Sequence, residues 1–355
     1  MTHMSSTVNR PGRTGARSAP GPASSLTGVV TILDVARAAG VSKSTVSRVL
    51  DERLPRSSSP AAERVRRVAA ELGYVRDPLA SGLRRSGTST VGVIVPRLTD
   101  TVMAMLYEQI VAAATGQGLF AVVATTEDQP ETEMRAVETL VRRRVDGLVL
   151  TTARLGTPSA PGVPHVLALR TDGIGPASVG DDQLGARLAV RHLLDHGHTR
   201  IGLVGGPEYA SSAQDRLVGY RRALQEAGLP VDESLIAGNA FSMESGEIAG
   251  RALLDRADRP TAIFAVNDNT AIGVLAAAHT LGLSVPGDLS LIGYNDIPVV
   301  SRLPVPLTTI RVPFGQIASG ALDLLREVGR GDAPRTVVAS PTLIPRSSTG
   351  RPPGS

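Results

Sequence analysis

The chain has 355 residues, of which 42% are hydrophobic and 20% are charged, a balance typical of folded domains and sufficient for two or three of them. No stretch approaches the roughly 18 consecutive apolar residues of a membrane span, and the polar start lacks the apolar segment of an export signal. We therefore expect no membrane partner and a cytoplasmic address. The absence of cysteine excludes disulfides, thiolate nucleophiles and cysteine-ligated metal sites.

Charge is distributed unevenly along the chain. Residues 1–90 contain 14 Lys and Arg against 6 Asp and Glu, whereas the remainder contains 23 against 27. The N-terminal quarter is therefore suited to a polyanion such as nucleic acid, and the rest of the chain is not.

The first 90 residues divide into three parts. Residues 1–28 are rich in Pro, Gly, Ser and Thr and carry three arginines, which predicts a flexible basic arm. Residues 29–75 show helical spacing of apolar residues and predict three short helices, with caps at Thr31, Ser42 and Ser59 and a stop at Gly40. Residues 76–89 are polar and predict a linker.

Within residues 29–75, the spacing of small and apolar residues predicts a helix-turn-helix. Ala36 allows two helices to cross closely, Gly40 tolerates a positive φ in the turn, and Val46 fixes the second helix against the first. The outward positions of that second helix carry Lys43, Ser44, Ser47 and Arg48, which can donate to bases or phosphates. A helical hairpin with incidental charge is the alternative.

From residue 90 onward, short apolar runs alternate with amphipathic helical patterns. This alternation is typical of parallel α/β folds, and its length favours two doubly wound sheets. The runs are Val91–Pro96, Leu119–Thr125, Gly147–Thr152, His165–Leu169, Ile201–Gly205, Ala262–Val266 and Leu289–Tyr294, and the helical patterns include Val102–Thr115, Leu184–His196, Ser212–Ala227 and Thr270–Leu281.

Several ordered blocks resemble the lactose-repressor (LacI/GalR) family of bacterial transcriptional regulators. They include TILDVARAAGVSKSTVSRVLDE, GARLAVRHLLDHGHTRIGLVGGP and TAIFAVNDNTAIGVLAAAHTLGLSVPGDLSLIGYND, within a resemblance that spans roughly residues 30–346. The resemblance implies an all-α helix-turn-helix headpiece and a periplasmic-binding-protein-like core of two doubly wound subdomains. It also implies a homodimeric repressor that binds a pseudo-palindromic operator in double-stranded DNA. Its affinity for the operator would be controlled by a small-molecule effector such as a sugar, and it would not be an enzyme.

The resemblance also assigns the DNA-binding residues. Residues 76–89 match the family's hinge helix, in which Leu83 would wedge into the minor groove. Ser81 and Gly82 depart from the family's usual Arg-Ser there, and Gly82 disfavours a helix by about 1 kcal/mol. The implied contacts are Thr31, Ser42, Lys43, Ser44, Thr45, Ser47, Arg48, Ala80, Leu83 and Arg84.

The resemblance further implies that residues 90–346 bind the effector and dimerise, and that three crossovers join the two subdomains near Asp181, Val312 and Pro341. Parallel sheets bind ligands beyond the carboxyl ends of their strands. That rule and the resemblance nominate Asp100, Thr125, Arg170, Gln214, Phe241, Asn267, Asp268, Asn295 and Asp296. Asn267 and Asp268 could instead cap the following helix, and Phe241 could be a core residue.

Some positions depart from the family and leave the effector's identity open. Gln214 stands where the family usually has Arg, Asn295 and Leu169 where it has Asp, and Asp100 where it often has Asn. No cofactor or metal is expected, since the cluster of His192, His196 and His198 resembles a helix end. A doubly wound metabolic enzyme or a solute-binding protein is the alternative. Residues 347–355 are expected to be a flexible tail.

Overall fold

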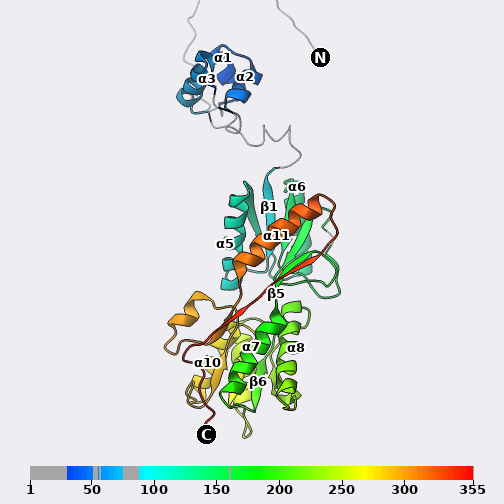
Figure 1. Ribbon diagram of the computed structural model, residues 1–355, viewed down its shortest axis with the longest axis vertical. Helices are drawn as coiled ribbons and strands as arrows, with labels where there is room; N and C mark the ends of the chain where they lie inside the picture. The colour runs from blue at the N-terminus through cyan, green and yellow to red at the C-terminus, as the bar shows by residue number, and fades with distance from the viewer. Residues whose placement is uncertain (1–29, 51–54, 56, 75–87, 160, 355) are drawn as a thin grey trace, which may run out of the picture. The chain divides into compact units, whose positions relative to one another are not determined.

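The computed structural model describes residues 30–50, 55, 57–74, 88–159 and 161–354. The chain divides into two units, residues 1–81 and residues 82–355 (Figure 1). The predicted basic arm, residues 1–28, and residues 76–87 of the predicted linker lie outside the described residues. Thr88, near the end of that linker, is held to the second unit because its backbone N–H donates to Asp146.

The described part of the first unit contains the three predicted helices. Thr31 closes a capping box with Asp34, Ser42 accepts a hydrogen bond from the backbone of Thr45, and Ser59 precedes a proline at the first turn of the third helix. The helices are α1 (Ile32–Ala39), α2 (Lys43–Val49) and α3 (Pro60–Glu71).

A small apolar core holds these helices together. Its buried members, one or more from each helix, are Val35, Ala36, Ala39, Val46, Val65 and Ala69. Gly40 ends α1 with a φ of 64°, a conformation that glycine adopts without strain. Arg64 of α3 donates to the carbonyl of Ala39, so all three helices are fixed around the turn. The predicted roles of Ala36, Gly40 and Val46 are confirmed.

The second unit contains two α/β lobes, and the first lobe is built on a six-stranded parallel sheet. The strand order is β11-β5-β4-β3-β1-β2. The strands are β1 (Thr90–Val95), β2 (Phe120–Thr125), β3 (Gly147–Leu150), β4 (His165–Ala168), β5 (Ala177–Gly180) and β11 (Thr336–Ala339). Helices α5 (Thr101–Gly116) and α11 (Phe314–Gly329) pack together on one face, and α6 (Pro130–Arg142) covers the other (Figure 1).

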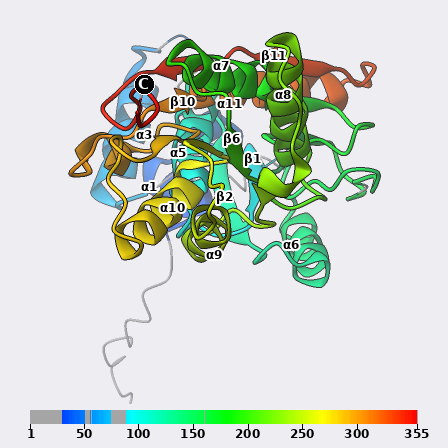
Figure 2. The same cartoon turned by 90° about the horizontal axis from the view of Figure 1, so that it is seen from below.

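The second lobe is built on a four-stranded parallel sheet in the order β7-β6-β8-β9. Figure 2 shows helices α7 and α8 on one side of β6 and helices α9 and α10 on the other. The strands are β6 (Ile201–Val204), β7 (Ile236–Ala237), β8 (Ala262–Ala265) and β9 (Ser290–Ile292), and the helices are α7 (Asp182–Asp195), α8 (Ser211–Glu226), α9 (Met243–Leu254) and α10 (Asp268–Thr280). Short 3-10 turns are η1 (Glu233–Leu235) and η2 (Pro298–Arg302).

The chain passes between the lobes three times. It leaves the first sheet after β5, returns between β10 (Thr309–Arg311) and α11, and leaves again between β11 and β12 (Thr342–Ile344). β10 and β12 pair in an antiparallel ribbon. The predicted crossovers near Asp181, Val312 and Pro341 are therefore confirmed, as is the prediction of two doubly wound subdomains.

The prediction of a flexible tail over residues 347–355 is wrong for the described part, which ends at residue 354. Ser348 is fully buried and donates to the carbonyl of Leu291, while the backbone N–H of Gly350 donates to Ser290. These contacts extend the second lobe beyond residue 346, because small polar residues can satisfy the backbone of a buried segment. Within the described residues, no helix combines the length and apolarity needed to cross a membrane.

Candidate functional site

The outward face of α2 carries three polar side chains. Lys43, Ser44 and Arg48 are exposed, whereas Val46 on the opposite face is completely buried. Neither cation forms an ion pair with any residue that the structure describes. The helix therefore presents two charges and a hydroxyl to solvent on a face held rigidly by the core behind it.

The other residues predicted to contact DNA differ in their surroundings. Thr31 and Ser42 are exposed but their hydroxyls accept helix-capping bonds, and Thr45 and Ser47 are half-buried. The three hinge positions, Ala80, Leu83 and Arg84, lie outside the described residues.

A cavity of about 730 Å³ lies between the two lobes of the second unit. Its walls follow the carboxyl ends of strands in both sheets, as expected for open parallel sheets. The volume is within the range of small-molecule sites. The first lobe contributes Pro96, Arg97, Thr99, Asp100, Thr101, Glu127, Asp128, Gln129, Pro130, Arg154 and Arg170, and the second contributes Pro207, Tyr209, Ala240, Phe241, Ser242, Met243, Glu244 and Asn269.

Backbone strain is concentrated at the strand ends that face this cleft. Seven described residues other than glycine have a positive φ, and five of them follow β2, β4 or β9. They are Glu127, Asp128, Leu169, Asn295 and Asp296. Such conformations are costly and cluster at binding sites, where the surrounding structure imposes them.

Five of the predicted effector residues meet at the floor of the cleft, where a smaller cavity of about 40 Å³ lies. They are Asp100, Arg170, Phe241, Asn267 and Asn295. Burial raises the pKa of the Asp100 carboxyl, although hydrogen bonds from Val102 and Asn269 lower it. The floor thus combines carboxylate and amide groups, a guanidinium and an aromatic ring.

The remaining predicted residues lie outside the walls of both cavities. Thr125 is exposed at the end of β2, and Gln214 is half-buried in α8. Asp268 is completely buried and accepts hydrogen bonds from Ile297 and Thr309, and its burial raises its pKa to about 7. Asp296 forms ion pairs with Arg311 and Arg346 instead of facing the cleft.

Asn267 both caps a helix and lines the floor. Its side chain accepts from the backbone of Thr270 at 2.7 Å, and its amide donates to the carbonyl of Phe241 at 3.0 Å. The cap anticipated as an alternative is therefore present, and it holds the loop that carries Phe241.

Sequence reasoning missed a polar cluster that joins the two lobes. Asp128 of the first lobe accepts hydrogen bonds on both carboxylate oxygens from Nη1 of Arg170, at 3.0 and 3.1 Å. It also accepts a 2.8 Å hydrogen bond from the Tyr209 hydroxyl of the second lobe. Burial, followed by the hydrogen bond to Asp128, raises the pKa of Tyr209. Asp128 and Tyr209 each follow an apolar run of the sequence. The rule that ligands bind beyond the carboxyl ends of strands, which nominated Arg170, would have included them if it had been extended by a few residues.

Further contacts close the cleft around this cluster. The guanidinium of Arg154 lies 4.0 Å from the centre of the Tyr209 ring, and the backbone N–H of Leu155 donates to the carbonyl of Tyr209. The backbone N–H of Thr171 donates to the Ser211 hydroxyl at 2.8 Å, and the side-chain amide of Asn269 donates to the Asp100 carboxylate at 3.3 Å. The lobes are thus held together by hydrogen bonds and a cation–π contact.

A buried ion pair supports the floor from the second lobe. Arg216 lines the small cavity, contacts Asp182 at 2.8 Å and donates to the carbonyl of Val266. Its guanidinium lies 3.8 Å from the centre of the Tyr294 ring. Because the Arg216 guanidinium is paired with Asp182 and also donates to Val266, its charge can be buried at the floor of the cleft.

The histidine cluster joins the C-terminal segment to α7. His192 is bonded to Thr349, and His198 to Thr261, Ser290 and the carbonyl of Gly350. No group of three or more His, Asp or Glu placed to hold a metal occurs among the described residues.

Comparison with known proteins gives matches for both units. Residues 31–77 match "Bacterial regulatory proteins, lacI family", and residues 190–349 match a periplasmic binding protein-like domain. The ribose operon repressor of Escherichia coli (strain K12) is 35% identical over 84% of this chain and 92% of its own length. This relative is by its name a repressor of an operon, that is, a regulator of transcription.

Two solved structures are similar over most of the chain. A transcriptional regulator CelR–cellobiose complex is 30% identical with a TM-score of 0.69, and a lac repressor dimer bound to operator and the anti-inducer ONPF is 29% identical with a TM-score of 0.79. Each alignment covers 90% of this chain and 99% of the solved chain. The chain therefore belongs to the lacI family of bacterial regulatory proteins, and it is a DNA-binding regulator of transcription.

Proposed function

We propose that the protein is a repressor that binds a pseudo-palindromic operator as a homodimer, and that a sugar or related metabolite in the interlobe cleft controls its affinity for the operator. The main observation behind this proposal is that one chain contains two features. One is a helix-turn-helix with a polar outward face, and the other is a separate cavity of ligand size between two lobes. The dimer, the operator and the sugar in the similar structures support this assignment.

The DNA-binding part of the proposal rests on α2. Lys43 and Arg48 can each donate to guanine O6 and N7 or to phosphate, and Ser44 can donate or accept. Two-fold symmetry would present two such helices to two half-sites.

The chemistry of the cleft favours a neutral polyol over an anion. Arg170 is already neutralised by Asp128, and Arg216 by Asp182, so neither offers a free positive charge. The other two arginines of the cleft walls, Arg97 and Arg154, are outnumbered there by the carboxylates of Asp100, Glu127 and Glu244. Asp100, Asn267 and Asn295 supply polar groups for hydroxyls, and Phe241 supplies an apolar surface for a ring face. The departures at Gln214 and Asn295 argue against transferring any particular sugar from a relative.

The test begins with selection of binding sequences from random duplexes, followed by footprinting with and without a panel of neutral sugars that includes ribose and cellobiose. We expect an inverted repeat to be selected and at least one sugar to change its occupancy. Absence of any sequence preference at low salt would contradict the proposal.

Calorimetry with a sugar identified in this way tests the site. Phe241→Ala should weaken its binding at least tenfold, because the ring surface is lost. Phe120→Ala, at an exposed position on β2, is the matched control. The sugar should be recovered unchanged, as expected for a protein that is not an enzyme, and operator binding implies a cytoplasmic address.

A further inference from the structure

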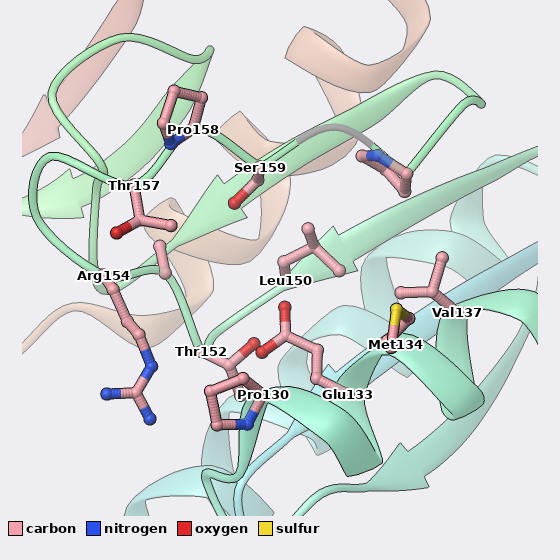
Figure 3. A pocket seen from close by; sticks show the side chains of 12 residues that line it. Pro130, Glu133, Met134, Val137, Leu150, Thr152, Arg154, Thr157, Pro158 and Ser159 are labelled. Carbon is pink, nitrogen blue, oxygen red and sulfur yellow. The ribbon is translucent and has the colours of Figure 1, made fainter.

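A second cavity, of about 430 Å³, lies in the first lobe between α6 and the segment that follows β3 (Figure 3). It shares only Pro130 and Arg154 with the walls of the interlobe cleft, and it contains none of the predicted effector residues. Its lining residues are Pro130, Glu133, Met134, Val137, Leu150, Thr152, Ala153, Arg154, Thr157, Pro158, Ser159 and Pro161.

One part of this cavity is apolar. Leu150 and Ala153 form a buried base at 1% and 3% exposure, and Val137 and Met134 line it from α6. Met134 is 59% exposed although it lies beside an unfilled apolar space. An apolar body of a ligand would bury these surfaces from water.

The other part contains a buried polar group that lacks a partner. The Nε of Arg154 is buried and unpartnered within the described chain, although its Nη2 donates to the carbonyl of Asp128. Buried polar groups are nearly always satisfied, so the Arg154 Nε indicates a missing partner. Thr152 lies nearby at 1% exposure, with its hydroxyl beside the Glu133 carboxylate (Figure 3).

Glu133 completes the polar part. Its carboxylate points toward the Thr152 hydroxyl from α6 (Figure 3). Burial raises the pKa of the Glu133 carboxyl, and a hydrogen bond with Thr152 offsets part of this increase. The cavity therefore presents an acceptor at Glu133, a donor at Arg154 and a hydroxyl between them that can do either.

We propose that this cavity is a second ligand site, which binds a neutral aliphatic molecule carrying a carboxamide or a similar paired donor and acceptor. The Nε–H of Arg154 would donate to the ligand carbonyl, the ligand N–H would donate to Glu133, and the Thr152 hydroxyl would bond to either group. The aliphatic part would lie against Met134, Val137 and Leu150. An anionic head is disfavoured because Glu133 would repel it.

The site is placed to influence the lobes. The same Arg154 that offers its Nε to the cavity lies over the Tyr209 ring of the second lobe. A ligand that fixes this guanidinium would favour the closed arrangement, since a ligand shifts an equilibrium by its differential affinity for the two states. Ligand binding in the second cavity does not depend on the proposed operator or sugar. It can therefore be tested separately from the proposed function.

The test follows the methyl signals of the full chain, labelled with ¹³C-methyl methionine, in NMR spectra. Hexanamide is added as the probe ligand. The sequence has six methionines, of which Met134 lines this cavity, while Met103 and Met243 line the cleft. Individual Met→Leu substitutions assign the signals. We expect saturable shifts of the Met134 methyl signal with little change at Met243, and weaker binding of hexanoate.

Two variants test the chemistry. Thr152→Val is nearly isosteric and should weaken hexanamide binding about tenfold through loss of one hydrogen bond. Thr115→Val, at an exposed position of α5, is the matched control. Val137→Phe, which narrows the cavity from α6, should abolish the Met134 shift in protein whose circular dichroism is unchanged. No saturable Met134 shift up to the solubility limit of hexanamide, or equal binding to wild type and Thr152→Val, would overturn the proposal.

Discussion

The two faces of α2 show how single residues divide their roles between folding and recognition. Val46 is buried because it fixes the helix on the small core, while Arg48, two residues later, projects into solvent. The 3.6-residue period of the helix produces this division. A change at Arg48 should therefore alter DNA binding with little effect on folding.

At this scale, Arg48→Ala should reduce affinity for the selected operator by about 1–3 kcal/mol, the range for loss of a good base contact. Its effect on random duplex should be smaller. Fluorescence anisotropy titrations at several salt concentrations measure both values. Arg67→Ala, on exposed α3, is the matched control, and equal losses on operator and random DNA would show that Arg48 contacts only phosphate.

At the level of elements, the loop after β6 connects the lobes. Tyr209 reaches Asp128 through its hydroxyl and Arg154 through its ring, so one side chain engages two loops of the first lobe. Contacts within the protein therefore help to hold the two lobes in this arrangement, and an effector would add to or compete with them.

Tyr209→Phe should keep the ring but lose the hydrogen bond to the Asp128 carboxylate, a loss of about 1–3 kcal/mol from lobe closure. Because the natural chain has no cysteine, spin labels on Glu131→Cys and Arg251→Cys, one in each lobe, can report the interlobe distance. We expect a longer or broader distance distribution in the variant.

Tyr220→Phe is the control for this experiment, since the Tyr220 hydroxyl donates to Ile201 entirely within the second lobe. It should lower stability without changing the interlobe distance. An unchanged distribution in Tyr209→Phe would show that this hydrogen bond does not hold the lobes together.

Across the whole molecule, the three crossovers and the C-terminal segment join parts that are far apart in the sequence. Residues near 350 return to the second lobe and cover His198, which is 1% exposed and bonded to Thr261, Ser290 and Gly350. Burial lowers the pKa of His198, although the carbonyl of Gly350 raises it. The attachment of this segment should therefore depend on pH.

Because the folded-state pKa of His198 is depressed, its contribution to stability is present above its usual value of 6.5 and is lost as the pH falls. Asp268 acts in the opposite direction, since its raised pKa favours folding below about 7. Comparison of wild type with His198→Gln isolates the contribution of His198 to stability, because Asp268 is present in both proteins. The stability advantage of wild type over this variant, measured by urea unfolding, should shrink between pH 7.5 and pH 5.5, and a constant difference would contradict it.

The sequence by itself determined the features that depend on local periodicity and short motifs. The three headpiece helices, their caps and seven of the strands follow from such patterns, whereas the crossovers were implied by the family resemblance. The patterns did not single out β5, β7, β10, β11 or β12, because short strands with few apolar residues do not differ from loops until neighbouring strands pair with them.

Only the tertiary structure decided which strand-end residues meet. Asp100 and Asn295 come together at the cleft floor, whereas Asp296, the neighbour of Asn295, turns away to Arg311 and Arg346. Tyr209, Arg154 and Asp128 meet across two lobes, and Thr152 and Glu133 meet in the second cavity. The direction of each of these side chains depends on backbone dihedral angles and on partners that are remote in sequence. A linear pattern of residues contains neither.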